Sequence, residues 1–496
     1  MDSDDALIRS RLQKLETLRQ QGIAPYARRF PKPQSIQALL ADFHEGRAVS
    51  AAGRLAAKRQ HGRSSFADLR DLTGRIQLLL KQDLVGEPAY QLFDTLDLGD
   101  VVGVAGTLVT TKTGERTIQV QSLELLAKSL RPLPEKWHGL KDTEARYRRR
   151  YLDLAANQDA GHVFVQRSRL VREIRSLLDQ RGFLEVETPM MQPMAGGAAG
   201  EPFVTHHKAL DIDLHLRLAP ELYLKRLLVG GFDKIYEVNR CFRNEGLSPR
   251  HNPEFTMLEA YASYEDCAYV MQLTQDIIAH AAQQLCGSPR VTYQGQTIDF
   301  TPPWPRFSFA GHLEREYGIR PDDGVDALWA AVRRIRKLPE AKGPISRSQV
   351  VRLVEELIEP QTQGPPGSAE KGGRTGAPIF VVDYWTELSP LAKSLPDRPL
   401  IADRFELYIA GMEIANGYSE LNDPIEQRRR FEQQLAAGEQ PAGRPRTIDE
   451  DFVEALEYGM PPAGGLGIGI DRLAMLLTNQ PSIKDVILFP QQKPEA

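Results

Sequence analysis

The segment 235–261, IYEVNRCFRNEGLSPRHNPEFTMLEAY, gathers residue types that can bind a nucleotide. An apolar run passes into a polar, turn-rich loop and a second run returns from it, which predicts two strands joined by a long loop. Arginine binds phosphate through paired hydrogen bonds, and an aromatic ring lets a base stack. We expect a phosphate clamp here, with a solvated loop carrying a few surface ion pairs as the alternative. The candidate residues are Arg243, Glu245, Arg250, His251, Asn252 and Phe255.

The returning strand carries a carboxylate between two aromatic rings. Side chains alternate between the faces of a strand, so Phe255, Met257, Glu259 and Tyr261 are predicted to share one face. An unpaired buried carboxylate is costly. We therefore expect this face to meet a cationic ligand.

A second cluster lies in 404–423, RFELYIAGMEIANGYSELND. Apolar residues alternate and Ala410–Gly411 forms a plausible tight turn, which makes Glu406 and Glu413 diagonal neighbours on one face. Their repulsion becomes attraction around a divalent cation, and Mg²⁺, which is held by one or two carboxylates plus nucleotide phosphates, is the candidate. An exposed acidic hairpin is the alternative. A polar row on a single face comes next: Asn416, Tyr418 and Glu420.

A glycine-rich turn precedes an apolar helical run in 464–477, GGLGIGIDRLAMLL. Arg472 lies in or near the first turn of this predicted helix, where a cation opposes the helix dipole. An anion over that helix end would account for it, because the N-terminal amides also attract phosphate. Alternatively, the glycines permit close packing and Arg472 pairs with a nearby carboxylate.

Glu221 lies at a predicted helix start in 217–231, RLAPELYLKRLLVGG, after Pro220 and before the stop signal Gly230–Gly231. It either caps the helix dipole or contributes a carboxylate to the cationic pocket.

The motifs of several other reaction classes are missing from the sequence. It contains no GxxxxGK[ST] phosphate loop, no cysteine and histidine spacing typical of zinc, and no persuasive nucleophile and base pair. An anion clamp, an acidic metal-binding pair and a carboxylate pocket remain. This combination fits attack by a substrate carboxylate on the α-phosphorus of ATP, where catalysis consists mainly of positioning and charge neutralisation.

The composition is that of a globular protein of several domains. The chain has 496 residues, of which 41% are hydrophobic and 26% are charged. No apolar run approaches the roughly 18 residues that a membrane span needs, and the N-terminus lacks the features of a signal peptide. The three cysteines, Cys241, Cys267 and Cys286, form no CxxC pair, so reduced thiols in a reducing compartment are expected.

Apolar periodicity divides the chain into an α+β arrangement. Residues 1–48 are predicted as a helical segment, with one helix over 5–21 that ends at Gly22. Residues 49–130 contain five short alternating runs, the last two joined by the turn KTGE, which predict a small β-barrel. Residues 131–157 are predicted as a linker, and 158–496 as a larger domain of helices and strands. Within the larger domain, the Gly-, Pro- and Ser-rich residues 363–377 are predicted to form a mobile surface loop.

The charge is distributed unevenly between the front and the back of the chain. Residues 1–150 hold 25 Lys and Arg against 18 Asp and Glu, whereas the remainder holds 37 against 48. A basic front part suggests a polyanionic partner, although an ordinary solvated surface is the alternative. In the barrel, Phe66 could stack on an unpaired base while Gln77 and Glu115 read base edges. A lone Phe on a strand is, however, more often a core residue.

Three segments together resemble the signature motifs of the class II aminoacyl-tRNA synthetases. GFLEVETPMMQPMAGGAA is similar to motif 1 and the residues directly after it, FRNEGLSPRHNPEF to motif 2, and GLGIGIDR to motif 3. The resemblance is most specific for the bacterial lysyl-tRNA synthetases, through THHKALDIDLHLRLAPELYLKRLLVGG, SPLAK and EIANGYSELND, and extends over nearly the whole chain. It implies an N-terminal anticodon-binding barrel of the oligonucleotide-binding (OB) type and a catalytic antiparallel sheet flanked by helices.

The resemblance also implies roles for individual residues. The family is cytoplasmic, uses lysine, ATP, Mg²⁺ and tRNA(Lys), and usually forms homodimers through motif 1. Arg243 would bind the α-phosphate and Arg472 the far phosphates, as the two catalytic residues. The nucleotide would also contact Glu245, His251, Asn252 and Phe255, and magnesium would lie at Glu406 and Glu413. The residues around lysine would be Gly197, Glu221, Glu259, Tyr261, Asn416, Tyr418 and Glu420. In the barrel, the anticodon would contact Phe66, Gln77 and Glu115.

The chain departs from the family pattern in two places, the long loop around 363–377 and the residues on either side of SPLAK. Three rival functions are weighed against the family. An aspartate or asparagine enzyme needs a basic or amide-reading group where Glu420 stands. A paralogue that attaches lysine to an elongation factor lacks the barrel. A non-enzymatic nucleic-acid-binding module leaves the acidic pair and the anion clamp without a role.

Overall fold

The computed structural model describes residues 2–31, 33–133, 140–194, 196–198, 200–339, 345–357, 376–436 and 448–494. The chain divides into two compact units, Met1–His162 and Val163–Ala496. Most of the predicted loop 363–377 lies outside the described residues. The segment predicted as a linker, 131–157, contains two short helices, α5 (Thr143–Arg148) and α6 (Arg150–Ala156), which belong to the first unit.

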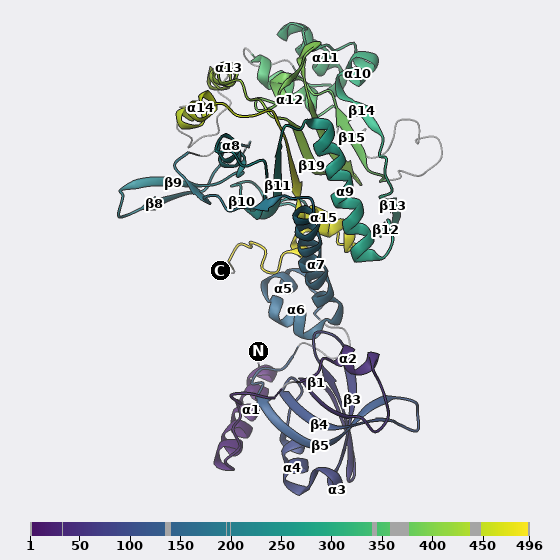
Figure 1. Ribbon diagram of the computed structural model, residues 1–496. Coiled ribbons are helices and arrows are strands. Elements are labelled where there is room, and N and C mark those ends of the chain that lie inside the picture. The colour runs from purple at the N-terminus through teal and green to yellow at the C-terminus, as the bar shows by residue number, and fades with distance from the viewer. Residues whose placement is uncertain are drawn as a thin grey trace. The chain divides into compact units, whose positions relative to one another are not determined.

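The first unit is a closed five-stranded barrel with the strand order β1-β2-β3-β5-β4 (Figure 1). Alternate residues of each strand point inward and form a core of aliphatic side chains, which is why the period-two pattern predicted these strands correctly. The predicted N-terminal helix is α1, and Gly22 ends it with a φ of 72°. The elements are α1 (Asp2–Gln20), α2 (Ile36–Ala41), β1 (Ala48–His61), β2 (Ser64–Arg70), β3 (Arg75–Lys81), α3 (Gln82–Val85), α4 (Glu87–Thr95), β4 (Val101–Thr110) and β5 (Arg116–Ala127).

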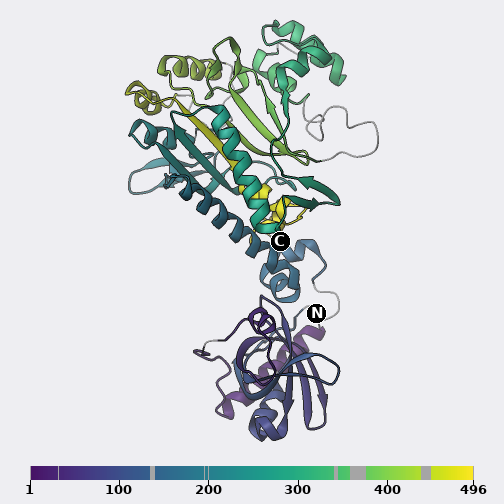
Figure 2. The same ribbon diagram turned by 45° about the vertical axis from the view of Figure 1, so that its right-hand side comes forward.

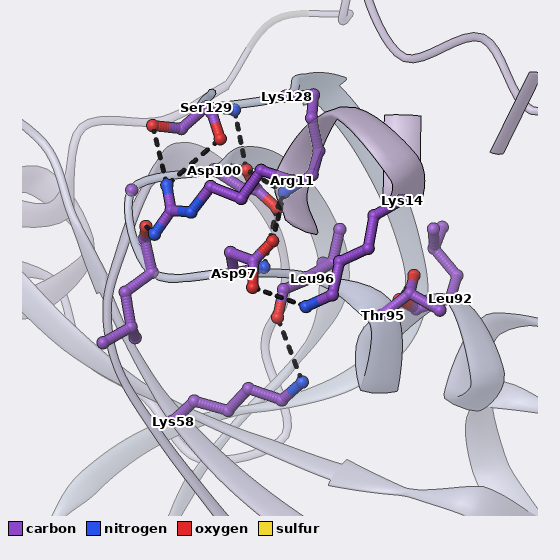
Figure 3. A network of polar contacts seen from close by, with 12 residues as sticks. Arg11, Lys14, Lys58, Leu92, Thr95, Leu96, Asp97, Asp100, Lys128 and Ser129 are labelled. Carbon is purple, nitrogen blue, oxygen red and sulfur yellow. Dashed lines mark hydrogen bonds and ion pairs between the residues drawn. The ribbon is translucent and has the colours of Figure 1, made fainter. Parts of the chain in front are cut away.

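Ion pairs anchor α1 to the barrel (Figure 3). Lys14 lies 2.6 Å from Asp97, and the fully buried Lys128 lies 2.6 Å from Asp97 and 2.9 Å from Asp100. Arg11 donates to the carbonyl oxygen of Leu98 at 3.0 Å. The buried Lys128 has two carboxylate partners and the Arg11 guanidinium donates to backbone carbonyl oxygens, so the network fixes the helix with its buried charges paired or hydrogen-bonded.

The second unit is built on an eight-stranded sheet with the order β14-β15-β18-β19-β20-β11-β10-β6. Only the two outermost pairs, β14 with β15 and β6 with β10, are parallel. The predicted long-looped hairpin is β10 and β11. The strands are β6 (Leu184–Glu185), β10 (Lys234–Phe242), β11 (Glu254–Ser263), β14 (Arg306–Ser308), β15 (Ile379–Val382), β18 (Arg404–Ile409), β19 (Met412–Ser419) and β20 (Ala463–Gly469).

One face of this sheet is covered by helices. The long helix α9 (Cys267–Cys286) crosses β18, β19 and β20 (Figures 1 and 2). Its apolar residues pack with those of α7 (Gln158–Gln180) and α15 (Ile470–Leu477) and with Leu258 and Ala260 of β11. Residues of β11 that alternate with these two point to the opposite face, away from this core. That opposite face carries the candidate site.

The remaining elements surround the sheet. None of the described helices is long and apolar enough to span a membrane. These elements are β7 (Met191–Gln192), β8 (Val204–His207), β9 (Ile212–Leu216), α8 (Glu221–Val229), β12 (Arg290–Tyr293), β13 (Gln296–Asp299), α10 (Phe309–His312), η1 (Leu313–Tyr317), α11 (Val325–Arg336), α12 (Arg347–Glu355), η4 (Thr386–Leu388), β16 (Ser394–Leu395), β17 (Arg398–Ala402), α13 (Pro424–Ala436), α14 (Glu450–Glu457) and α16 (Ile483–Val486).

Candidate active site

Strand register assembles the candidate site on the face of the sheet opposite α9. Glu259 of β11 pairs with Gly467 of β20, and Gly467 pairs with Asn416 of β19. Asn416 in turn pairs with Glu406 of β18. Directly paired residues of antiparallel strands point to the same side, so these four form one row across four strands.

The glycine run of β20 forms the floor of the site. Gly465, Gly467 and Gly469 alternate along the strand and therefore share the site face. A Cβ at Gly467 would lie 3.2 Å from Met257 and 3.4 Å from Asn416. Because glycine has no side chain, space remains between the polar residues of β11 and those of β19. Space for the site therefore explains Gly467, whereas Gly464 permits close helix packing, because a Cβ there would lie 2.6 Å from the Asp266 carbonyl oxygen at the start of α9.

The loop between β10 and β11 presents unpaired nitrogen and oxygen atoms to a pocket. The Arg243 guanidinium lies over the Phe255 ring, 5.1 Å from its centroid, and Arg243 Nε is buried without a hydrogen-bond partner among the described residues. Asn252 donates to the carbonyl oxygen of Glu254 at 2.6 Å, but its own Oδ1 is buried and has no partner within the described part of the chain. Unsatisfied buried groups of this kind fit a polar ligand.

Arg472 closes the same pocket from the start of α15. It donates to the carbonyl oxygen of Glu413 at 2.7 Å, lies 3.4 Å from the Glu413 carboxylate and contacts His251 Nε2 at 3.2 Å. Burial and the Arg472 charge lower the pKa of His251, which favours the neutral ring. The alternative predicted from the sequence, in which Arg472 pairs with a nearby carboxylate, is also observed, because Arg472 lies beside Glu413. Pocket-lining residues include Arg243, Glu245, Arg250, His251, Asn252, Phe255, Glu413, Asn416 and Arg472.

Glu406 and Glu413 lie on the hairpin of β18 and β19 as predicted. Ala410 and Gly411 form its turn with φ angles of 51° and 70°. Glu406 is only 6% exposed, so the alternative of an exposed acidic hairpin is wrong for this residue. It accepts hydrogen bonds from the hydroxyls of Tyr384 at 2.7 Å and Tyr408 at 2.8 Å.

Each carboxylate of the acidic pair has an arginine neighbour: Arg404 forms an ion pair with Glu406, and Arg472 lies 3.4 Å from Glu413. Burial and the neighbouring Glu406 raise the pKa of Glu413. Burial also raises the pKa of Glu355, at the end of α12, to about 7, with Glu406 and Glu413 adding to the shift and Arg404 opposing it. Among the described residues no group of three or more His, Cys, Asp or Glu is arranged to hold a metal. Two carboxylates completed by phosphate oxygens still match the way proteins hold Mg²⁺.

Carboxylates and phenols gather at the other end of the floor, in a cluster that we call the ammonium pocket. Tyr261 donates to Glu259 at 3.1 Å, and Tyr418 donates to Glu221 at 2.6 Å. Glu420 is 1% exposed, and its Oε1 has no hydrogen-bond partner within the described residues. Burial raises the pKa of both Glu259 and Glu420 to about 8. The pocket comprises Glu221, Glu259, Tyr261, Tyr418 and Glu420, with the fully buried Lys225.

Glu221 begins α8 after Pro220, as predicted, but its side chain turns into the ammonium pocket. Gly197 lies against it with a φ of 80°, and a Cβ there would be 3.3 Å from the Glu221 Cβ. Glu245 and Arg250 are exposed at the rim of the phosphate pocket, and Arg250 donates to the carbonyl oxygen of Gly411 at 2.9 Å.

Several residues of the site were missed from the sequence. Asp471 is buried, accepts from the Thr256 amide at 2.7 Å and pairs with Arg167 of α7 at 2.6 Å, so it ties the start of α15 to β11. Its position beside Arg472 was the only available signal. Lys225 comes four residues after Glu221, a spacing that brings side chains together on a helix.

The barrel presents its predicted residues on the outer surface. Core residues of β2 and β3 alternate with Phe66 and Gln77, which are half-buried on the outside, so Phe66 does not belong to the barrel core. Asp68 pairs directly with Gln77 and lies 3.2 Å from Arg75. Glu115 is exposed and lies 4.0 Å from Arg75. Phe66 pairs across the strands with Arg59, and both Arg59 and Arg75 have Asp68 as an ion-pair partner.

Comparison with known families agrees with both units. Residues 142–493 match the family described as tRNA synthetases class II (D, K and N), and residues 49–126 match the OB-fold nucleic acid binding domain. The protein belongs to the class II aminoacyl-tRNA synthetases, a family of ATP-dependent ligases.

Similar proteins narrow the class further. The chain is 50% identical to the lysine–tRNA ligase of Moorella thermoacetica over 100% of this chain and 99% of that protein. It is 50% identical to that of Carboxydothermus hydrogenoformans over 98% of each chain, and 46% identical to that of Bacillus subtilis over 97% of this chain and 96% of that protein. Within the class, the chain falls in the lysine–tRNA ligase group.

Proposed function

We propose that this enzyme activates L-lysine with ATP to lysyl-adenylate and pyrophosphate and then transfers lysine to the 3′ end of tRNA(Lys). The observation that carries the proposal is the arrangement on one glycine floor. A phosphate clamp with Arg243 and Arg472 occupies one end, and three buried carboxylates occupy the other. ATP needs the first kind of group, and the two ammonium groups of lysine need the second.

The first chemical step joins the two substrates. A carboxylate oxygen of lysine attacks the α-phosphorus of ATP, a new P–O bond forms, and the bond to pyrophosphate breaks. Arg243 would neutralise charge on the α-phosphate, and Phe255 beneath it would support the adenine. Arg472, held by Glu413 and His251, would bind the far phosphates. Glu245, His251 and Asn252 would surround the nucleotide.

The ammonium pocket would select and orient lysine. Gly197, Glu221, Glu259 and Asn416 would surround the α-amino and carboxylate groups. Glu420 would face the ε-ammonium beside Tyr261, while Tyr418 holds Glu221 through its hydroxyl. A neutral amino acid would leave these buried carboxylates unpaired, which disfavours its binding.

Glu406 and Glu413 would hold Mg²⁺. The ion would add positive charge around the β- and γ-phosphates when bound. Tyr384 and Tyr408 support this role because they fix the orientation of Glu406 from one side.

In the second step a terminal ribose hydroxyl of tRNA attacks the carbonyl carbon of the adenylate, and AMP leaves. Phe66, Gln77 and Glu115 would contact the anticodon. We further propose that two copies of the chain associate through motif 1, and that the enzyme works in the cytoplasm, where tRNA and ATP are available. Exposed apolar side chains near motif 1 support the dimer: Leu184, Met190, Met191, Val204, Leu210 and Ile212.

The decisive test is amino-acid-dependent exchange of labelled pyrophosphate into ATP, with Mg²⁺ and without tRNA, across the twenty amino acids. We expect exchange with lysine alone. Exchange with a different amino acid, or with none, would reject the proposed substrate.

A further inference from the structure

A lysine of the protein itself lies among the carboxylates of the ammonium pocket. Lys225 is on α8, one turn after Glu221, and its side chain is completely buried. Its Nζ lies 2.9 Å from Glu221 Oε1 and 2.5 Å from Glu420 Oε2. The ammonium therefore links α8 to the segment directly after β19.

Additional groups hold this ammonium in place. Nζ lies 3.4 Å from the carbonyl oxygen of Leu391 and 5.6 Å from the centroid of the Tyr418 ring. The Tyr418 hydroxyl donates to the same Glu221 oxygen that Lys225 contacts. A fully buried ammonium with two carboxylate partners would lose both if it moved away. Lys225 is consequently a fixed part of the pocket.

The charges of the pocket suggest why the ammonium is there. Glu221, Glu259 and Glu420 supply three carboxylates, and Lys225 supplies one positive charge. An excess of two negative charges remains when all three carboxylates are ionised. Both carboxylate oxygens of Glu420 are buried and make no hydrogen bond within the described residues, and Oε2 is the oxygen that lies 2.5 Å from Lys225 Nζ in an ion pair. One oxygen is thus engaged by the protein, and the other is free for a ligand.

We propose that Lys225 is a positioning and specificity residue of the lysine pocket: it fixes the Glu221 and Glu420 carboxylates and leaves two negative charges for the two ammonium groups of one lysine. This inference rests on the proposed function. Without Lys225, Glu221 and Glu420 would repel each other in a buried site, and one of them would take up a proton or turn away. Either change weakens the pocket for a doubly cationic ligand.

The other charged groups around the pocket do not alter this balance. Arg217 and Glu237 form a buried ion pair at 2.6 Å, and together they are neutral. Tyr261 and Tyr418 stay protonated, because burial raises the pKa of each phenol well above its ordinary value. Among the described residues, the titratable and charged groups facing the pocket are Glu221 and Lys225 from α8, Glu259 and Tyr261 from β11, Tyr418 and Glu420 from β19 and the segment after it, the Arg217–Glu237 pair, and Arg404 of β18, which lies opposite Tyr418 and is paired with Glu406.

Pyrophosphate exchange by the full-length enzyme tests the proposal with Lys225→Met and Lys225→Arg. We expect Lys225→Met to raise the KM for lysine by at least about tenfold, with the KM for ATP and kcat within about threefold. Lys225→Arg should recover part of the loss. In Lys225→Met the lysine KM should also reach its minimum at a higher pH, because the Lys225 charge lowers the pKa of Glu420.

Arg226→Met is the matched control. Arg226 is the next residue of α8, but it pairs with Asp449 at 3.0 Å and Asp451 at 2.7 Å, away from the carboxylates of the pocket. The KM of the Arg226→Met enzyme for lysine should match that of the wild type. The inference is overturned if Lys225→Met leaves lysine KM and its pH profile unchanged, lowers lysine KM, or raises the lysine and ATP KM values alike. Failure of wild-type exchange with lysine would instead reject the proposed function.

Discussion

Single residues give the two ends of the site opposite charge balances. At the phosphate end, Arg243 and Arg472 offer N–H donors, and Arg243 Nε has no partner within the described residues. At the ammonium end, Glu259 and Glu420 are buried carboxyl groups whose pKa is raised to about 8. Each end is therefore incomplete without a ligand of the opposite charge. When ATP and lysine bind together, the phosphates pair with the arginines and the ammonium groups pair with the carboxylates.

The raised carboxyl pKa values predict a pH-dependent affinity for lysine. Glu259, whose pKa burial raises to about 8, is mainly protonated below that pH in the free enzyme. Ammonium groups bind the ionised form, so lysine binding must release protons, and affinity should rise by up to about tenfold per pH unit for each proton released. The rise should end near pH 8. Calorimetry in buffers of different ionisation enthalpy measures the proton release, and an affinity independent of pH between about 6.5 and 8 would contradict it.

Substitution of Glu420 should affect lysine binding at the ammonium end of the site without affecting ATP binding at the phosphate end. Glu420→Gln keeps the shape of the side chain but removes the charge that would face the substrate ammonium. We expect lysine binding to weaken by about 2–5 kcal/mol while ATP binding is unchanged. Isothermal titration with each substrate measures both effects. Unchanged lysine affinity would reject the role of Glu420.

At the scale of elements, β20 determines how much space the site has. Its residues Gly465 and Gly467 lie between the polar side chains of β11 and β19. A Cβ at Gly465 would overlap Glu420 Oε1 and approach Tyr261 Cε1 to 2.6 Å. The glycines therefore maintain the pocket, and the sheet itself does not require them.

Gly465→Ala should consequently impair lysine activation selectively. The added methyl group would displace Glu420 and Tyr261, so we expect the KM for lysine to rise at least about tenfold, while ATP binding and the far-UV circular dichroism spectrum stay as in the wild type. Gly324→Ala is the matched control, because Gly324 has a negative φ of -64° and nothing lies within 4 Å of its Cβ position. Equal loss of ATP and lysine binding in Gly465→Ala would indicate general disruption of the sheet.

The barrel element should contribute to tRNA recognition alone. Phe66→Ala removes a half-buried ring from the outer surface of β2, where stacking on a base contributes roughly 1–3 kcal/mol. We expect a higher KM for tRNA in aminoacylation and no change in pyrophosphate exchange without tRNA. A parallel loss in both reactions would assign Phe66 a structural role.

Local sequence patterns predicted individual strands and the faces of their side chains, whereas the arrangement of the site depends on pairing between strands far apart in the chain. The barrel strands and the shared face of Glu259 and Tyr261 follow from period-two alternation, which a single segment contains. The row from Glu259 to Glu406 depends on the pairing of four strands far apart in the chain. A β-bulge between Leu407 and Tyr408, and the contact of Lys225 with Glu420, similarly have no local signal. Contacts between side chains of distant segments could therefore not be predicted from the sequence.

At the scale of the whole molecule, the face near motif 1 predicts a second copy of the chain as partner. Leu184 is 53% exposed on the edge strand β6, and Met191 is 53% exposed on β7. Monomers seldom leave large apolar patches in water, and a two-fold interface would bury the same patch on both copies. We therefore expect sedimentation equilibrium of the wild type at micromolar concentration to give about twice the chain mass.

Leu184→Asp together with Met191→Asp should shift this equilibrium to the monomer, because each interface would then bury charges without partners. Ile425→Asp is the matched control, since Ile425 is 81% exposed on α13, outside this face, and its substitution should leave the dimer intact. If the double variant keeps the dimer mass, the two copies associate elsewhere or not at all. If it becomes a folded monomer with reduced lysine activation, association through this face also supports the geometry of the active site that motif 1 adjoins.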